Sequence, residues 1–255
     1  MSALHLKTED GIAMLTLDNP SKLNALTIPM LEALDAHCAV LEQDSDVGVV
    51  ILCAKGDRAF CVGADINAWA DLSPRDFARN WVRTGHRIFN RLAQLPQPTI
   101  AVLSGPAFGG GLELATTCDL RVSSPGAILA LPETSVGIVP GWSGSQRLAD
   151  HLPPAILKEM ALLGHRLSAE RGYQLGYINE IAEDPLACAY GMAKKILSKS
   201  SYATEITKCM IQSALGEATS EMVEVLGGGM IASSHDKVEG IQAFREKRKP
   251  KFQGN

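Results

Sequence analysis

The stretch Ala107-Phe108-Gly109-Gly110-Gly111-Leu112-Glu113 carries the fold prediction for this chain. It follows closely on the apolar run 99–103, which is typical of a buried strand. The three glycines enter a helical Leu-Glu-Leu-Ala-Thr-Thr pattern, so they form a turn whose backbone N–H groups can hold negative charge. Glu113 is expected in the first turn of that helix. Taken alone, such a turn is as often only a tight connection.

Two further segments strengthen the functional interpretation. Phe60-Cys61-Val62-Gly63-Ala64-Asp65-Ile66 is a second strand-like segment that runs into a glycine-containing turn before a helical pattern. Two such turns can each offer one backbone N–H to a single oxygen, which is the construction of an oxyanion hole. Leu131-Pro132-Glu133 adds a second carboxylate, 20 residues after Glu113.

At this point the chain resembles the crotonase superfamily of enoyl-CoA hydratases and isomerases. The segments that carry the resemblance occur in family order along nearly the whole chain: Asn24-Ala25-Leu26, Gly63-Ala64-Asp65-Ile66, Gly105 to Glu113, Cys118-Asp119-Leu120, Pro132-Glu133, Gly137 to Arg147 and Glu239-Gly240-Ile241-Gln242-Ala243-Phe244. The resemblance implies an α/β fold, a crotonase-like spiral of ββα units with a C-terminal helical trimerisation region. It also implies a homo-trimer or a homo-hexamer built as a dimer of trimers.

The order of predicted elements agrees with an α/β core. Strand patterns occur at 12–17, 47–53, 99–103, 120–123 and 128–131. Beyond about residue 185 only helical patterns follow, at 185–197, 203–215, 220–232 and 236–247. We therefore expect a core with the acyl-CoA site over 1–195 and a helical region over 196–255 for oligomerisation and coenzyme A contact. Apolar tail residues such as Met222, Val225 and Leu226 are expected to pack against another subunit.

Composition narrows the classes of function. With 255 residues, 46% of them hydrophobic, the chain can bury a sizeable core. A net charge of −4 argues against a nucleic-acid partner. The N-terminus has no basic region followed by an apolar run, and no stretch approaches the roughly 18 apolar residues of a membrane span. The sequence predicts a cytoplasmic protein with neither a nucleic-acid nor a membrane partner.

The sequence also predicts no metal and no separate cofactor. The six cysteines form no Cys-x-x-Cys pair and have no histidine at ligand spacing, so we expect structural thiols. The glycines at 109–111 do not complete Gly-x-Gly-x-x-Gly, because Leu114 occupies the last position, and no Gly-Lys-Ser/Thr ending follows. Coenzyme A is expected only as part of the substrate.

The expected chemistry assigns roles to four residues. Adding water to an α,β-unsaturated thioester places negative charge on the thioester oxygen, which two fixed N–H donors, those of Ala64 and Gly110, can stabilise. One carboxylate must deprotonate water and an acid must protonate C2. The helix N-terminus favours ionised Glu113, the base, while the nearby charge raises the proton affinity of Glu133, the acid.

Substrate contacts follow from the resemblance. They are expected at Ala25, Leu26, Ala64, Asp65, Ile66, Gly110, Trp142 and Phe244, the last of which, with a nearby lysine, would meet the adenine and 3′-phosphate of coenzyme A. Close relatives usually read Pro-Gly-Ala/Gly-Gly-Gly-Thr-Gln-Arg where this chain reads Pro140-Gly141-Trp142-Ser143-Gly144-Ser145-Gln146-Arg147. The indole of Trp142 either lines the acyl pocket or plugs the core, and both alternatives stay open.

The presence of both glutamates favours a hydratase. The Δ3,Δ2-enoyl-CoA isomerases that the chain also resembles generally use a single glutamate near the position of Glu133, with another residue at the position of Glu113. An isomerase or another crotonase-type reaction is the alternative enzyme. A catalytically silent acyl-CoA-binding oligomer is the non-enzyme alternative, against which the glutamate pair argues.

Overall fold

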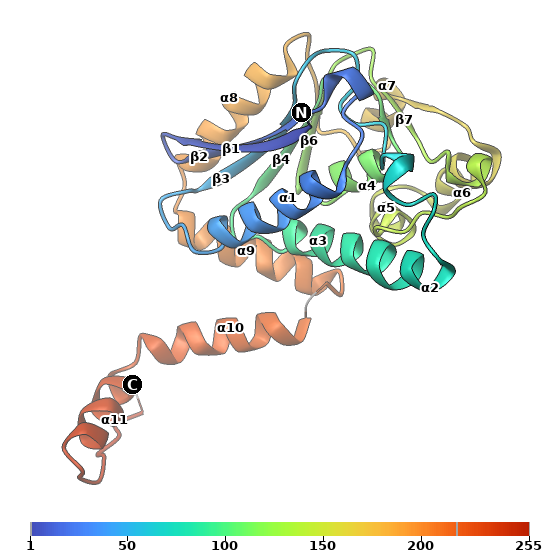
Figure 1. Ribbon diagram of the computed structural model, residues 1–255. Coiled ribbons are helices and arrows are strands. Elements are labelled where there is room, and N and C mark those ends of the chain that lie inside the picture. The colour runs from blue at the N-terminus through green and yellow to red at the C-terminus, as the bar shows by residue number, and fades with distance from the viewer. Residues whose placement is uncertain (1, 218, 255) are drawn as a thin grey trace. The chain divides into compact units, whose positions relative to one another are not determined.

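The computed structural model describes residues 2–217 and 219–254, without the side chains of 219–223, so the expectation for the Met222 side chain lies outside the described residues. The chain forms two compact units, Met1–Thr204 and Glu205–Asn255. The first unit holds both sheets and most of the helices (Figure 1). The expected α/β class is confirmed for this unit.

The main sheet has six strands in the order β1-β2-β3-β4-β6-β9. They are β1 (Ala3–Glu9), β2 (Ile12–Asp18), β3 (Val49–Ala54), β4 (Thr99–Leu103), β6 (Leu120–Ser123) and β9 (Glu180–Ile181). β1 and β2 pair antiparallel, and every other neighbouring pair is parallel. The strands predicted at 99–103 and 120–123 are confirmed to the residue, whereas the one predicted at 47–53 begins at Val49.

Helices fill the connections between the strands of the first unit. They are α1 (Ile28–Leu41), α2 (Pro74–Asp76), α3 (Arg83–Ala93), α4 (Gly110–Thr116), α5 (Gly144–His151), α6 (Pro154–Leu163), α7 (Ala169–Gln174) and α8 (Pro185–Leu197), with the short 3-10 segments η1 (Pro20–Lys22), η2 (Ile66–Ala68) and η4 (Glu133–Val136) and the π-helical segment η3 (Phe77–Val82). Leu31, Leu34, Cys38 and Leu41 recur at helical spacing and are buried along α1. Thr27 stands at the N-cap of α1 without a side-chain capping bond.

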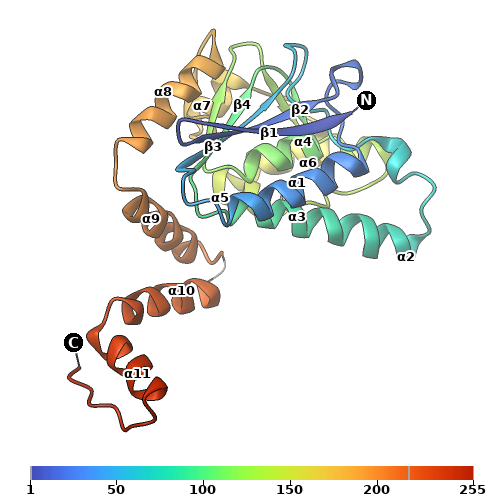
Figure 2. The ribbon, with the colours of Figure 1, turned by 60° about the vertical axis from the view of Figure 1, so that its left-hand side comes forward.

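Both faces of the main sheet are covered, as a mostly parallel sheet requires. Alternate residues of β3 enter different cores. Val50 and Leu52 belong to the core that includes α1 and α3, while Val49 and Ile51 pack with α8. Figures 1 and 2 show α8 on one side of the sheet and α1 with α3 on the other. This alternation explains why the strand reads as a continuous apolar run.

A second, three-stranded sheet gives the chain its spiral. It consists of β5 (Ala107–Phe108), β7 (Ile128–Ala130) and β8 (Leu167–Ser168) in the order β5-β7-β8, and Cys61 adds an isolated bridge to Ala107. Three consecutive turns of the spiral follow the same order: a segment of the main sheet, a segment of the second sheet and then a helix. The first turn consists of β3, Cys61 and η2, the second of β4, β5 and α4, and the third of β6, β7 and η4. The loops that leave the second sheet lie at equivalent points of these turns.

The second unit is helical. The division between the units falls within α9 (Ser201–Ala214), and α10 (Thr219–Ala232) and α11 (His235–Arg245) follow. Ser234 caps α11 by accepting a hydrogen bond from Lys237 N–H. Several apolar side chains of this unit are exposed: Val225, Met230, Ile231, Val238, Ile241, Phe244 and Phe252. The predicted roles of this part in oligomerisation and coenzyme A contact stay predictions.

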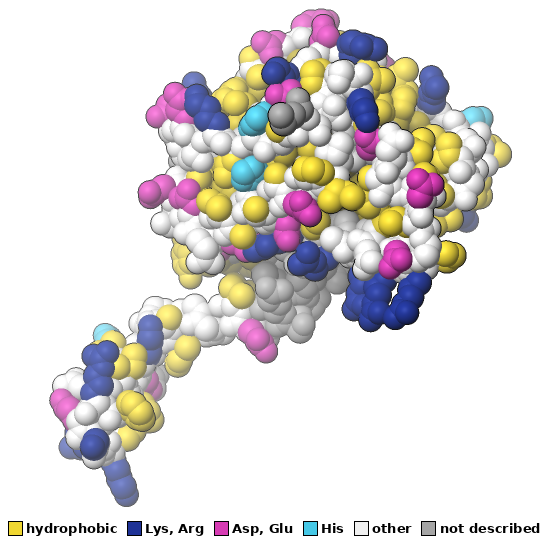
Figure 3. All heavy atoms as spheres, viewed as in Figure 1, with side chains coloured by type: hydrophobic (Ala, Val, Ile, Leu, Met, Phe, Trp, Pro, Cys, Tyr) yellow, Lys and Arg dark blue, Asp and Glu magenta, His cyan; other side chains and the backbone are white. Residues whose placement is uncertain are grey.

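Acidic and basic side chains are interspersed over the face that Figure 3 shows. Among the described residues, no helix has both the length and the apolar character needed to cross a membrane.

Candidate active site

Three turns of the spiral deliver the predicted oxyanion donors and one of the predicted glutamates. Ala64 follows the Cys61 bridge, Gly110 follows β5, and Glu133 follows β7. Leu26 secures the first of these turns, because its N–H donates to Gly63 O at 2.8 Å and its carbonyl accepts from Asp65 N–H at 2.8 Å. The topology therefore brings together residues that are distant in sequence.

The glycine turn before α4 has two separate steric requirements. Gly109 has a φ of +51°, and its N–H donates to Ala130 O of β7 at 2.9 Å. Gly111 lies so close to the preceding spiral turn that a Cβ there would fall 2.1 Å from Cys61 O. A side chain at 111 would force the two turns apart.

Ala64 and Gly110 present adjacent backbone nitrogens. A Cβ built on Gly110 would lie 3.7 Å from Ala64 N, and one built on Gly63 would lie 3.5 Å from Gly110 N. Within the described residues neither the Ala64 nor the Gly110 N–H donates a hydrogen bond to the protein. Two neighbouring backbone donors that face one pocket are the geometry of an oxyanion hole.

Glu113 is buried in the first turn of α4, where the sequence places it. Its Oε1 accepts hydrogen bonds from Trp142 N–H at 2.8 Å and Gly144 N–H at 2.7 Å. Between these donors Ser143 adopts a φ of +85°, and two N–H groups flanking such a residue can converge on one anionic oxygen. The loop 142–144 thus holds this carboxylate in one orientation.

The electrostatic expectation for Glu113 was wrong in direction. The helix N-terminus was expected to favour the ionised form, but burial raises the pKa of Glu113 above its usual value. The N–H groups of Gly144 and Trp142 oppose that rise. Desolvation is the largest cause because Glu113 is only 3% exposed.

Glu133 has very different surroundings. It opens η4, and neither of its buried carboxyl oxygens accepts a hydrogen bond from a side chain or from the backbone of another described residue. Burial raises the pKa of Glu133 to about 7, and the charge of Glu113 adds to the rise. The expected direction is confirmed, but its main cause is desolvation rather than the neighbouring charge.

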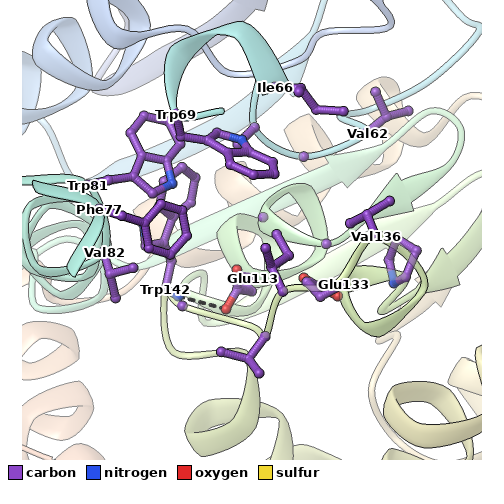
Figure 4. A pocket seen from close by; sticks show the side chains of 18 residues that line it. Val62, Ile66, Trp69, Phe77, Trp81, Val82, Glu113, Glu133, Val136 and Trp142 are labelled. Atoms are coloured by element: carbon purple, nitrogen blue, oxygen red, sulfur yellow. Dashed lines mark hydrogen bonds between the residues drawn. The ribbon is translucent and has the colours of Figure 1, made fainter. Parts of the chain in front are cut away.

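The two glutamates share one apolar pocket of about 180 Å³ (Figure 4). Its walls come from the turns at 62–66, 109–113 and 132–142 and from the aromatic segment 69–82. Glu113 and Glu133 supply the ionisable groups, and the remaining side chains of the lining are apolar: Val62, Ala64, Ile66, Trp69, Phe77, Trp81, Val82, Pro132, Val136, Ile138, Val139 and Trp142.

The two alternatives for Trp142 both hold. Its indole is 3% exposed and packs on Trp81 and Phe89, with ring centroids 4.9 Å and 5.1 Å away. The same residue lines the pocket, close to Gly110. Trp142 is therefore a core residue that also forms part of the pocket wall.

The other residues predicted to contact substrate divide into two groups. Ile66 lines the pocket, as do Ala64 and Gly110. Among the described lining residues, Ala25, Leu26 and Asp65 are not present. Leu26 is buried, and the Asp65 carboxylate accepts from Lys22 Nζ at 2.7 Å. Phe244 lies in the second unit with 86% of its side chain exposed, so its contact with coenzyme A stays a prediction.

The aromatic wall was missed at the sequence level. Trp69 packs edge-on against Phe77 at 5.8 Å between centroids, and Phe77 and Trp81 lie on the π-helical segment η3. Phe77 and Trp81 recur at helical spacing, which in the sequence is typical of the buried face of an ordinary helix. The only available signal was their position shortly after the Gly63-Ala64-Asp65 turn.

Comparison with known proteins agrees with this geometry. The chain matches the enoyl-CoA hydratase/isomerase family over residues 7–255. It is 32% identical to a short-chain-enoyl-CoA hydratase of Clostridium acetobutylicum, over 96% of this chain and 95% of that protein. It is 33% identical to a crotonyl-CoA hydratase of Syntrophomonas wolfei, over 97% of this chain and 96% of that protein.

A solved structure extends the similarity to the fold. The enoyl-CoA hydratase from Bacillus anthracis superposes with a TM-score of 0.81 at 30% identity, covering 99% of each chain. The spiral of paired strands and helices described above is thus the crotonase-like fold that the sequence predicted. This chain belongs to the enoyl-CoA hydratase/isomerase family.

Proposed function

We propose that this protein is an enoyl-CoA hydratase, which adds water across the C2=C3 double bond of a 2-enoyl-CoA thioester. One observation carries the proposal: two backbone N–H donors and two glutamates in contrasting surroundings meet at one apolar pocket. Relatives named as short-chain-enoyl-CoA and crotonyl-CoA hydratases support the reaction class. Acyl-CoA is accordingly the proposed substrate, and coenzyme A enters only as part of it.

The oxyanion donors carry the first role. As water adds at C3, negative charge develops on the thioester oxygen, and the N–H groups of Ala64 and Gly110 would bind that oxygen. Fixed donors in a pocket shielded from solvent are worth about 3 kcal/mol each in comparable enzymes. Because they belong to the backbone of two turns that line the pocket, they need little reorganisation during the reaction.

The glutamates divide the proton transfers. Glu113 acts as the base: its Oε1 is held by two N–H groups, which leaves Oε2 to orient a water and take its proton as the hydroxyl bonds to C3. Glu133, with a pKa of about 7, carries the proton that goes to C2. After the reaction Glu113 carries the proton taken from water, and Glu133 has lost its proton. Loss of a proton from Glu113 and gain of one by Glu133 return the enzyme to its starting state.

The test is a product assay in deuterium oxide with 2-enoyl-CoA and 3-enoyl-CoA substrates. A hydratase converts the 2-enoyl thioester to 3-hydroxyacyl-CoA with deuterium at C2, read by mass spectrometry. Conversion of only the 3-enoyl substrate to the 2-enoyl product would instead identify an isomerase. Binding of both thioesters without any product would identify a silent acyl-CoA-binding protein.

Two wider expectations belong to this proposal. A homo-trimer or homo-hexamer remains the proposed assembly, supported by the exposed apolar side chains of the second unit. A cytoplasmic location likewise stays a proposal. Neither is needed for the chemistry of the pocket in the first unit.

A further inference from the structure

The indole of Trp142 packs so closely against α3 that only glycine fits at position 85. A Cβ on Gly85 of α3 would lie 2.1 Å from Trp142 Nε1 and 2.3 Å from Cε2, so any side chain at 85 would displace the indole. Trp81 and Phe89 contact the indole from neighbouring positions, with centroids at 4.9 Å and 5.1 Å. Such close packing on the protein side leaves the indole little freedom to move.

The remaining side of the indole borders the reaction site. A Cβ on Gly110 would lie 3.0 Å from Cε3 and Cζ3 of Trp142, so the six-membered ring lies against the residue that supplies an oxyanion donor. The Trp142 N–H meanwhile holds Glu113. The indole therefore forms a fixed part of the pocket wall beside Gly110 and Glu113.

The space in front of this wall is small. The pocket has about 180 Å³, and an apolar cavity of about 150 Å³ accommodates benzene, with its six non-hydrogen atoms. In proportion, the pocket holds about seven non-hydrogen atoms, which corresponds to the thioester oxygen and an acyl chain of about six carbons. Apart from the two glutamates, the lining offers no ionisable side chain to receive a polar group on the acyl chain.

We propose that Trp142, held in place by Gly85, sets the length limit of the acyl group, so that the pocket takes apolar acyl chains of about four to six carbons and excludes longer ones. The assignment rests on the proposed acyl-CoA site but not on turnover. Trp142 is thus a specificity-determining residue.

The experiment measures binding rather than catalysis, which separates this inference from the proposed function. Isothermal titration calorimetry of the full chain with butyryl-, hexanoyl-, octanoyl- and decanoyl-CoA gives a ranking of Kd values without any reaction. For the wild type we expect decanoyl-CoA to bind at least about 10-fold more weakly than hexanoyl-CoA, since one misfitting methylene already costs about 10-fold or more. Equal or tighter binding of decanoyl-CoA by the wild type would overturn the inference.

Variants of Trp142 then test whether the indole sets the length limit of the acyl chain. Trp142→Ala is expected to improve decanoyl-CoA binding relative to butyryl-CoA by about 10-fold or more, and Trp142→Phe by less, because it opens less space. Phe89→Leu is the matched control: Phe89 contacts the same indole but does not line the pocket, so it should lower stability and leave the ranking unchanged.

Either Trp142 variant can decide the outcome. If Trp142→Ala does not fold, the direction in which Trp142→Phe changes the ranking of Kd values is used. A folded variant of either kind whose ranking equals that of the wild type would overturn the assignment. A shift of the same size in Phe89→Leu would also overturn it, since loosened packing and not pocket depth would then explain the change.

Discussion

Glu113 and Glu133 border the same pocket, but their carboxyl groups differ in the hydrogen bonds that they accept. Glu113 lies on α4, and its carboxylate accepts hydrogen bonds from two N–H groups of the loop 142–144. Glu133 opens η4 and receives no hydrogen bond from another described residue. Both are buried; the burial of Glu113 is opposed by N–H groups of Trp142 and Gly144, and that of Glu133 only by its own backbone N–H.

The difference shows how one fold can supply a base and an acid from the same residue type. Donors to a carboxylate favour its ionised form, whereas burial without donors favours the protonated form. The loop that carries Trp142 and Ser143 provides both donors to Glu113. The division of roles therefore depends on backbone N–H groups rather than on further charged side chains.

The largest expected effect comes from neutralising either glutamate. Glu113→Gln and Glu133→Gln should each lower hydration by about 10²-fold or more, the usual loss when a catalytic acid or base is removed. Folding should persist because glutamine is nearly isosteric. Exposed Glu170→Gln is the control for loss of a negative charge, since it does not line the pocket. A wild-type rate in either pocket variant would remove that residue from the mechanism.

The oxyanion donors should matter almost as much as the glutamates. Gly110→Pro removes the N–H at the first position of α4, where proline is compatible with a helix, although its Cβ would lie 3.0 Å from the Trp142 ring and the indole must shift slightly. The variant should lower kcat by about 10²-fold or more. Circular dichroism must show a native spectrum for the comparison to be valid. Unchanged kcat in a folded variant would show that Gly110 N–H is not a donor to the transition state.

The contrast between the glutamates also predicts a pH-dependent stability. The folded pKa of Glu133, about 7, exceeds its reference value of 4.5, so the folded state binds more protons between these values and stability falls as pH rises through that window. Glu133→Gln removes this loss. Its free energy of unfolding should exceed that of the wild type by up to about 3 kcal/mol near pH 8, and by much less near pH 5. Urea unfolding at both pH values measures the gap; a gap that does not grow with pH would contradict the raised pKa.

The smallest effect is expected at Ser143. Ser143→Gly relieves the positive φ but loses the contact between Ser143 Oγ and His86 Nδ1 at 3.1 Å. These changes oppose each other and are each worth about 1 kcal/mol, so stability should change by less than about 1 kcal/mol. Activity should also persist, because the Trp142 and Gly144 N–H groups remain. A large loss of kcat would show that the hydroxyl itself helps to orient the loop.

Much of the fold could be predicted from local patterns. The strand at 99–103 reads as a short apolar run and that at 120–123 as an alternating Leu-Arg-Val-Ser segment, and both were located to the residue. β1 was missed although Asp10-Gly11 between two alternating segments is a strong hairpin signal. The two-residue strands β5, β8 and β9 are too short to show a period, because tertiary pairing alone defines them.

The residues of the site could be predicted from the sequence, but their burial, pKa values and packing partners could not. The glycine turns and the glutamate spacing identified Ala64, Gly110, Glu113 and Glu133, which the spiral brings to one pocket. The pKa of Glu113 was misjudged because burial is invisible in a single helix turn. The aromatic wall and the role of Gly85 were missed for the same reason: helical spacing shows which residues are apolar, not what faces them.

A carboxyl titration tests directly whether the two glutamates hold different protonation states. ¹³C NMR of protein labelled at the glutamate side-chain carboxyl, assigned with Glu113→Gln and Glu133→Gln, follows each group through the neutral pH range. Glu133 should titrate near 7, whereas the two N–H donors to Glu113 favour the ionised form of that carboxyl group. If Glu133 instead titrates near its reference value of 4.5 and is ionised at neutral pH, it cannot serve as the resting acid, and the division of roles is contradicted.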